Sequence, residues 1–527
     1  SMWSDSIILP LFFAFISHFP LYVLSSNDSP LWPFPTSDLS NYKSSQVLDG
    51  SFHFGLQSQP GMTSFFSILK SAAVRYQNIL SVSPMAVGSI KGCAIKISEF
   101  SVDNNIVTAD ESYSLSVDET GSCTISSQTV WGALRAMETF TQLLTREKET
   151  NNVILGCATV SINDTPRFGH RGLLIDTARH YIPIETIKTV LDSMPMSKLN
   201  VLHWHVVDAE SFPLNTPSVP TMKDGAFTTD LIYSMEDLQV LKSYAFERGV
   251  QLIIELDIPG HAASWTKGKP QIMADCFVKY SYNINDFALN PTLSDTFTAI
   301  EAIMSDVITA TQATTVHLGG DEVVYGCWRE DAGIVQYMAD NAVSSFDQLL
   351  SQFVSKVDGI MASLIRSPQQ TTIHWEEVFT AGAASGLLSN SSNTIFQVWT
   401  DSNKVNTVTA AGYRVIASPS NYWYLNNAAN TWKVMYSYDP TVGLATEATH
   451  FVIGGEAAMW GETVDDTNLV STVYPRLAAV AERLWSGIDV VDLTDAERRL
   501  LIQRCRMLAR GFAASPVKPG YCDTQYV

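Results

Sequence analysis

Short apolar runs rich in β-branched residues recur along the chain from about residue 170 onward, with helix-like stretches between most of them. The eight runs lie at 173–175, 201–207, 251–254, 315–316, 371–373, 394–396, 414–416 and 451–453. Short apolar strands that alternate with helices indicate parallel strands covered on both faces. Eight of them predict an α/β fold built on a closed, eight-stranded parallel β/α (TIM) barrel.

An open, doubly wound sheet is the alternative arrangement of these elements. Such a sheet usually carries a glycine-rich phosphate loop after its first strand. Here Ile175 is followed by Asp176-Thr177-Ala178-Arg179, which contains no glycine. The sequence therefore favours the barrel.

The region ahead of the barrel has a different pattern, in which strand-like and helix-like pieces alternate. Residues 47–56 and 92–100 are predicted as strands, and residues 64–79 and 132–140 as helices. We therefore expect a smaller α+β domain over residues 27–166. The turn-forming Asp164-Thr165-Pro166 marks its end, and residues 167–527 form the barrel domain.

The chain begins with a segment whose apolar block, at residues 7–24, ends in two serines. This pattern predicts a signal peptide over residues 1–26. A membrane anchor is the alternative, but His18 and Pro20 interrupt the block and disfavour a spanning helix. Because no later stretch is long and apolar enough to cross a bilayer, we expect no membrane span in the mature chain.

Composition narrows the classes of partner. The 527 residues are 46% hydrophobic and 16% charged, which excludes wholesale disorder. The net charge of −20 would repel the phosphate backbone, so no nucleic-acid partner is expected. An acidic surface suits an acidic compartment, where carboxylates take up protons and self-repulsion falls.

Seven cysteines give an odd count, which leaves at least one thiol free or paired outside the chain. Secretion favours disulfides. Cys505 and Cys522 close a short loop, and Cys276 and Cys327 lie in segments that follow neighbouring predicted strands. The cysteines without an assigned partner are Cys93, Cys123 and Cys157. Three N-x-S/T sequons, relevant to a secreted chain, start at Asn27, Asn163 and Asn390.

Acidic and aromatic side chains follow nearly every predicted barrel strand, where a TIM barrel carries its active site. They are Asp176, Arg179 and His180; His203, Trp204, His205 and Asp208; Glu255, Asp257 and His261; His317, Asp321 and Glu322; Trp375, Glu376 and Glu377; Trp399 and Asp401; Tyr422, Trp423, Tyr424 and Asn426; Trp460 and Glu462. One such residue alone is usually structural. Aromatic rings, carboxylates and one arginine on a single rim are typical of a sugar site, because rings stack on C–H faces and charged groups bind hydroxyls.

The segment from His317 to Glu322 reads His-Leu-Gly-Gly-Asp-Glu and ends in adjacent carboxylates. Glycines let backbone and substrate approach closely. Paired acids in one site differ in proton affinity, as acid–base work on a glycosidic bond requires. Gly-Gly-Asp is also common in ordinary turns, so the motif alone does not identify a catalytic site. Its position after a predicted barrel strand is what makes it a catalytic candidate.

Two histidines offer a competing function. His203 and His205 share one face of a predicted strand and can bind zinc, with His261 and His317 as further ligands. A zinc hydrolase of barrel fold is therefore the alternative activity. A sugar-binding protein without catalysis is a third, which the intact Asp321–Glu322 pair argues against.

Long stretches of the chain resemble the lysosomal-type β-N-acetylhexosaminidases of glycoside hydrolase family 20. They lie in order at 31–35, 171–181, 203–208, 259–261, 317–322, 454–462 and 481–485. The resemblance implies an exo-acting, retaining enzyme that removes terminal β-linked GlcNAc or GalNAc from glycans or chitin fragments. It also implies a lysosomal or secreted location, no metal or other cofactor, and a homodimer as an assembly to test, since relatives often dimerise.

The resemblance also implies a mechanism. In this family the 2-acetamido oxygen of the substrate attacks the anomeric carbon, and an oxazoline-like intermediate forms. Glu322 then resembles the general acid and base. Asp321 resembles the residue that orients the acetamido N–H and offsets the developing positive charge.

Further site residues follow from the same resemblance. Arg179 is similar to the arginine that holds ring hydroxyls, and His261 to a histidine that supports the acid. The other expected substrate contacts are Asp208 and Glu462 to hydroxyls, Trp375, Trp399 and Trp460 around the acetamido group, Tyr424 to its oxygen, and Asn426.

Two departures from the family pattern are visible. Ala209-Glu210 stands where relatives often carry a second aspartate, and Asn427 follows Asn426 where one type of relative has an arginine. Because Asn427 supplies no positive charge, sulfated or sialylated sugars are not expected to be preferred.

Overall fold

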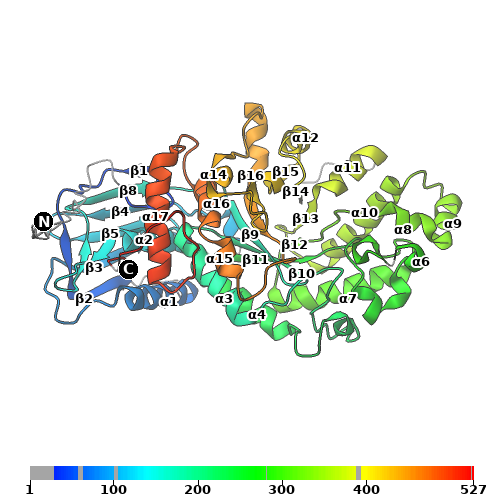
Figure 1. The fold of residues 1–527 in the computed structure, drawn as a ribbon, viewed down its shortest axis with the longest axis horizontal. Coiled ribbons are helices and arrows are strands. Elements are labelled where there is room, and N and C mark those ends of the chain that lie inside the picture. The colour runs from blue at the N-terminus through cyan, green and yellow to red at the C-terminus, as the bar shows by residue number, and fades with distance from the viewer. Residues whose placement is uncertain (1–28, 57–62, 100–104, 281, 387–392, 524) are drawn as a thin grey trace, which may run out of the picture.

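The computed structural model describes residues 29–56, 63–99, 105–280, 282–386, 393–523 and 525–527. The predicted signal peptide and the sequons at Asn27 and Asn390 lie outside these residues. Figure 1 shows a sheet domain at one end of the molecule and a helix-covered barrel at the other.

The N-terminal domain is built on an eight-stranded mixed sheet. Its order is β1 (Ser37–Asp38), β8 (Val160–Asp164), β4 (Tyr113–Val117), β5 (Cys123–Ser127), β3 (Ile90–Ile97), β2 (Gln46–Leu56), β7 (Val153–Leu155) and β6 (Leu144–Arg146). Helices α1 (Thr63–Leu80) and α2 (Val130–Gln142) pack against it. The predicted α+β domain is confirmed. The prediction named only two of the strands, because the others are five residues long or shorter and show little periodicity.

The second domain is a closed parallel barrel. Its strands are β9 (His170–Asp176), β10 (Val201–Val207), β11 (Gln251–Leu256), β12 (Thr315–His317), β13 (Thr371–Trp375), β14 (Thr394–Val398), β15 (Arg414–Ala417) and β16 (Val452–Met459). The ring closes where β16 pairs with β9 in parallel register. Each predicted apolar run overlaps one of these strands, so the predicted TIM barrel is confirmed.

Helices surround the barrel (Figure 1). They are α3 (Ile184–Ser193), α4 (Met235–Phe246), α5 (Trp265–Gly268), α6 (Phe277–Tyr280), α7 (Ser294–Thr311), α8 (Tyr325–Glu330), α9 (Ala332–Asp340), α10 (Phe346–Leu364), α11 (Glu376–Ser385), α12 (Lys404–Ala410), α13 (Ser420–Trp423), α14 (Trp432–Ser437), α15 (Leu469–Val473), α16 (Arg476–Trp485) and α17 (Leu493–Ala509). Strands β9 and β10 are buried at every position, as expected between the barrel interior and the helices. None of the helices in the described ranges has the length and apolar character needed to span a bilayer.

The barrel interior changes character along its axis. Near the N-terminal ends of the strands the interior is apolar, formed by Val201, Ile253, Ile373, Ile395 and Ile416. Side chains two and four residues further along β10 point the same way, and these are His203 and His205. The half of the interior next to the C-terminal ends of the strands therefore holds polar groups that must be paired with one another.

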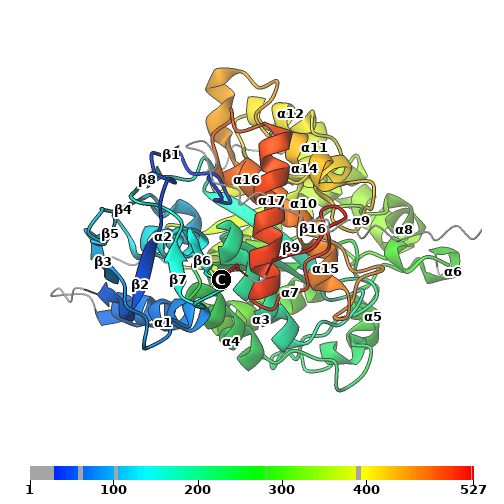
Figure 2. The same ribbon diagram turned by 60° about the vertical axis from the view of Figure 1, so that its left-hand side comes forward.

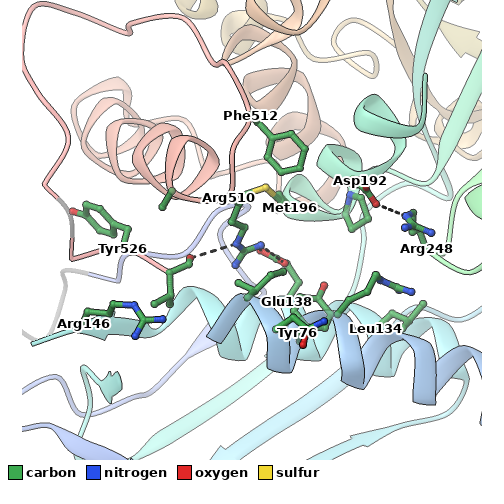
Figure 3. A pocket seen from close by; sticks show the side chains of 16 residues that line it. Tyr76, Leu134, Glu138, Arg146, Asp192, Met196, Arg248, Arg510, Phe512 and Tyr526 are labelled. Atoms are coloured by element: carbon green, nitrogen blue, oxygen red, sulfur yellow. Dashed lines mark hydrogen bonds and ion pairs between the residues drawn. The ribbon is translucent and has the colours of Figure 1, made fainter. Parts of the chain in front are cut away.

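The C-terminal helix α17 lies beside the N-terminal domain in both views (Figures 1 and 2). Arg510, which follows it, pairs with Glu138 of α2 at 2.9 Å. A cavity of about 680 Å³ opens at this junction (Figure 3). Its wall contains this pair and the pair of Arg248 with Asp192. No residue of the predicted sugar site lines it, so this cavity is separate from the barrel rim.

Three disulfides form. The two expected pairs, Cys276–Cys327 and Cys505–Cys522, are both bonded. The third joins Cys93 and Cys123, which face each other on the paired strands β3 and β5. Cys157 is free and buried, which accounts for the odd count. Spacing alone could not assign the third bond because Cys123 and Cys157 were equivalent partners until the sheet order was known.

Candidate active site

The turn after β12 presents the two adjacent acids. Gly319 has φ of +63°, and a Cβ there would lie 1.8 Å from the Asp257 carboxylate, so only glycine fits. The N–H of Gly320 donates to Oδ1 of Asp257 at 2.9 Å. Glu322 itself has a left-handed φ of +47°. The segment is therefore both a turn and a candidate catalytic element, because the turn brings the acids over the barrel.

Asp321 and Glu322 lie in opposite environments. Asp321 is 7% exposed, and its Oδ1 is buried without a hydrogen-bond partner among the described residues. Burial and the neighbouring Asp257 carboxyl raise the pKa of Asp321 well above its usual value. The Glu322 side chain is 57% exposed, and the neighbouring His261 ring lowers its pKa. Two acids adjacent in sequence thus differ in proton affinity in the free enzyme, and the buried Asp321 holds its proton to higher pH than the exposed Glu322.

His261 connects Glu322 to a buried carboxylate. Its Nε2 lies 3.4 Å from Oε2 of Glu322 and 3.8 Å from Oδ2 of Asp321. Its Nδ1 lies 3.0 Å from Oδ1 of Asp208. Burial lowers the pKa of His261, but the Asp208 carboxylate outweighs burial and raises this pKa well above its usual value. This raised pKa favours the protonated, cationic form of the ring beside Glu322.

Arg179 follows β9 and reaches the same carboxylate. Its Nη2 lies 2.8 Å from Oδ2 of Asp208, and its Nη1 donates to Asp176 at 3.0 Å. Its Nε donates to Oε2 of Glu210 at 3.1 Å. Glu210 was noted in the sequence only as a departure from the family pattern. The structure gives it a place in the site, as a third carboxylate around one guanidinium.

Four aromatic side chains form one wall of the site. The ring centroids of Trp375 and Trp460 are 6.1 Å apart, and Tyr424 lies 6.2 Å from both Trp399 and Trp460. The Trp399 indole N–H is held by Glu377 at 3.1 Å. Burial, followed by repulsion from Asp321, raises the pKa of Glu377 to about 8. The four rings predicted from separate strand ends therefore meet in one cluster.

The outer rim carries the remaining predicted residues. Asn426 Nδ2 donates to Oε2 of Glu462 at 3.3 Å. Glu462 and Asn427 are exposed. The residues predicted to catalyse or to bind substrate thus follow the C-terminal ends of strands of one barrel. Of the other strand-end candidates, Trp204 and Trp423 are fully buried in the hydrophobic core and do not belong to the aromatic cluster.

Histidines and acids below the rim include the candidate zinc ligands. His203, Glu255 and His317 place one ligand atom each within 4.8 Å of one another, and three further groups of described residues do the same around His205, Asp257 and His261. Both ring nitrogens of His205 already contact carboxylates, at 2.6 Å to Glu255 and 2.7 Å to Asp208. A metal at His205 would have to displace one of these contacts.

Glu456 was missed by the sequence analysis. It lies 2.6 Å from Nδ1 of His203 and 3.0 Å from Nε2 of His170 inside the barrel. The signal was present, because a single acid stands within an otherwise apolar strand, and buried acids are rare unless paired.

Comparison with known families decides the identity. The model for the catalytic domain of glycosyl hydrolase family 20 matches residues 168–488, and a "beta-acetyl hexosaminidase like" model matches residues 31–143. The chain belongs to glycosyl hydrolase family 20. The resemblance seen in the sequence is confirmed, and the chain is a β-N-acetylhexosaminidase of a family whose mechanism is retaining and substrate-assisted.

Relatives support this placement over most of the chain. The human beta-hexosaminidase subunit beta is 38% identical over 428 residues, which cover 79% of this chain and 74% of the relative. The rat subunit alpha is 33% identical over 522 residues, covering 94% and 95%. The crystal structure of a chitobiase from Flavobacterium johnsoniae has the same fold, with a TM-score of 0.79, 24% identity, and coverage of 92% and 73%.

Proposed function

We propose that Glu322 is the general acid and base of this family 20 enzyme and that Asp321 orients the substrate acetamide. The contrast between these neighbours carries the proposal. Glu322 is open to solvent, where a leaving group and water arrive. Asp321 is buried within range of the aromatic wall and has an unpaired oxygen, which suits an acetamido N–H donor.

The reaction then runs in two steps. The acetamido oxygen attacks the anomeric carbon while Glu322 gives its proton to the departing glycosidic oxygen. The ring that forms carries positive charge. This charge and the acetamido N–H favour the ionised form of Asp321, whose carboxylate then offsets the positive charge. Glu322, now ionised, takes a proton from water as the water oxygen attacks the anomeric carbon and the ring reopens. Two displacements on the same carbon retain its β configuration.

The surrounding residues are proposed to hold the sugar. Trp375, Trp399 and Trp460 enclose the acetamido methyl group, and the Tyr424 hydroxyl donates to the acetamido oxygen. The N–H groups of Arg179 that remain after its ion pairs, together with the exposed Glu462, bind ring hydroxyls. Asp208, expected from the resemblance to bind a hydroxyl as well, is fully buried, and both of its oxygens contact His205, His261 or Arg179. It therefore supports Arg179 and His261 from below. Asn426 supports Glu462 through their hydrogen bond.

The charge of the rim supports a neutral sugar. Glu210, Glu322 and Glu462 all reach the opening, and Asn427 adds no cation. An additional sulfate or carboxylate on the sugar would therefore meet like charge. We infer that terminal β-linked GlcNAc or GalNAc without an anionic group is the preferred substrate, on glycans or chitin fragments.

The cellular setting follows from the disulfides. Three disulfide bonds indicate an oxidising compartment and hence the secretory pathway. We propose a signal peptide at 1–26, the N-terminal domain at 27–166, the barrel domain at 167–527, and delivery to the lysosome or to the outside of the cell. A homodimer is proposed by analogy with the family. The sequon residue Asn163 is exposed on β8.

One assay tests the function. The assay compares matched aryl β-glycosides of GlcNAc, GalNAc and 6-sulfo-GlcNAc. Both neutral sugars should be hydrolysed, in either order of kcat/KM, and 6-sulfo-GlcNAc should have the lowest kcat/KM of the three. A kcat/KM for 6-sulfo-GlcNAc equal to that for GlcNAc would overturn the proposed preference. Absence of hydrolysis of all three would overturn the activity.

A further inference from the structure

A line of buried histidines and carboxylates runs through the barrel beneath the site. From the catalytic rim inward, Asp208 Oδ2 lies 2.7 Å from His205 Nε2, and His205 Nδ1 lies 2.6 Å from Glu255 Oε2. Glu255 Oε2 also lies 3.0 Å from Nε2 of His203. The line continues through Glu456, 2.6 Å from Nδ1 of His203. At its outer end Asp208 contacts His261, which faces Glu322.

Glu255 is the point where this line meets the aromatic wall. Its Oε1 accepts a hydrogen bond from the Trp375 indole N–H at 2.8 Å, while its Oε2 faces His205. The residue is fully buried, on the strand between those that carry His205 and the Asp321–Glu322 turn. One carboxylate therefore contacts both halves of the site, the side that supports the acid and the side that encloses the acetamide.

The contacts define the protonation of His205. Both of its ring nitrogens lie at hydrogen-bond distance from a carboxylate, and a carboxylate can only accept. Both nitrogens must therefore carry a proton, which makes the ring a cation between two anions. Charge-assisted hydrogen bonds of this kind are short and strongly oriented.

We propose that Glu255 is a positioning residue for hydrolysis. It holds His205 against Asp208, which in turn contacts His261 beside Glu322, and it holds the Trp375 ring in the acetamide pocket. The inference rests on the proposed roles of Glu322 and Asp321. Glu255 is fully buried beneath the rim and contacts His205 and Trp375 instead of opening to solvent. It acts by setting the position of these two groups and the charge of His205.

Several titratable groups face Glu255, and their protonation depends on its charge. They are His203 and His205 on β10, Asp257 on its own strand β11, His317 beyond it on β12, and, through these, Glu456, Asp208, His261, Asp321 and Arg179. Nδ1 of His317 accepts the N–H of Gly319 and cannot also donate to Glu255. His205 and Trp375 are thus the donors that the geometry assigns to Glu255 on the substrate side.

The test compares two buried carboxylates. Glu255→Gln keeps the size and one acceptor but removes the charge that holds His205 doubly protonated. The matched control is Glu482→Gln, whose carboxylate is equally buried and pairs with Arg499 at the domain junction. We expect Glu255→Gln to lower kcat about 100-fold, as a small misplacement of catalytic groups does. We expect Glu482→Gln to lower stability with kcat unchanged at temperatures where it is folded.

Nuclear magnetic resonance of selectively labelled histidine gives an independent readout. In the wild-type enzyme the His205 ring should keep both ring protons from pH 5 to pH 8, and Glu255→Gln should let it lose one within that interval. Glu255→Gln should also weaken inhibition by a thiazoline mimic of the intermediate, since Trp375 loses its acceptor charge.

Three results would overturn the proposal. They are a wild-type His205 that titrates between pH 5 and pH 8, a Glu255→Gln enzyme with unchanged kcat, and a loss of kcat in Glu482→Gln equal to that in Glu255→Gln. The first uses only the wild-type protein, so the proposal stays testable if Glu255→Gln does not fold. Failure of the wild type to hydrolyse any N-acetylhexosaminide would instead refute the proposed function, which keeps the two failures distinct.

Discussion

Nε2 of His261 lies 3.4 Å from Oε2 of Glu322. The Asp208 carboxylate on the other side of the ring raises the pKa of His261, so a cation faces the proposed catalytic acid. This arrangement lowers the pKa of Glu322 in the free enzyme. A general acid must hold a proton when the substrate binds, and this one holds it at acidic pH.

The first prediction concerns pH. The kcat/KM of the wild type should fall as pH rises through the pKa of Glu322, which gives an acidic optimum. His261→Asn removes the facing cation, so the pKa of Glu322 should rise and the alkaline limb should move to higher pH. Profiles of kcat/KM against pH measure this. His374→Asn is the control, because His374 is equally buried but pairs with Asp358 away from the site, and it should leave the limb in place.

The second prediction concerns the acid itself. Glu322→Gln should reduce kcat on an unactivated disaccharide by about 10² to 10⁴, the range for a positioned proton donor. Aryl glycosides with good leaving groups need less protonation and should lose less. Steady-state rates on both substrate types check this. Near-wild-type hydrolysis of the disaccharide would remove Glu322 from the role.

The third prediction concerns Asp321. A thiazoline mimic of the intermediate should inhibit the wild type strongly, since the site is built for the charged species. Asp321→Asn should weaken this inhibition and slow turnover, because the carboxylate that faces the positive charge is gone. Inhibition constants for both proteins measure the effect. Mass spectrometry after treatment with a 2-fluoro glycoside gives the opposing outcome, since a covalent adduct on Asp321 would mean that the protein supplies the nucleophile.

The fourth prediction concerns metal. Both ring nitrogens of His205 contact carboxylates, and Glu456 faces His203, so carboxylates occupy the donors that zinc would need. Activity should therefore survive exhaustive dialysis against EDTA or phenanthroline. The assay is kcat before and after dialysis. Loss of activity that zinc alone restores would favour the zinc hydrolase.

The fifth prediction concerns the domain junction. Lys198 is buried, and its Nζ lies 2.7 Å from Oδ2 of Asp164, which also accepts the Trp485 indole N–H. Lys198→Ala leaves a buried carboxylate without its cation and should lower the free energy of unfolding by about 3 to 5 kcal/mol. Lys188→Ala breaks an exposed pair with Glu185 and should cost less than about 0.5 kcal/mol. Urea denaturation of both variants measures the two free energies of unfolding. Equal losses would contradict the stabilising role given to the buried Lys198–Asp164 pair.

The sequence by itself determined the barrel and most of its rim. Apolar strands such as 173–175 and 201–207 must be buried on both faces, and the local pattern of apolar residues is enough to predict this burial. A strand end in a barrel also fixes where the next residues point. Asp321, Glu322 and Arg179 could therefore be placed on one rim before any contact was known.

Only the tertiary structure decided how those groups are charged and paired. The difference between Asp321 and Glu322 depends on burial, on Asp257 and on His261, which come from different strands. The bond of Cys93 to Cys123 likewise depended on the sheet order. The partners of Glu255 and Glu456 lie on other strands of the barrel, so they could be identified only from the closed barrel. Side-chain pairing across a barrel depends on the register of strands distant in sequence, and no local pattern encodes that distance.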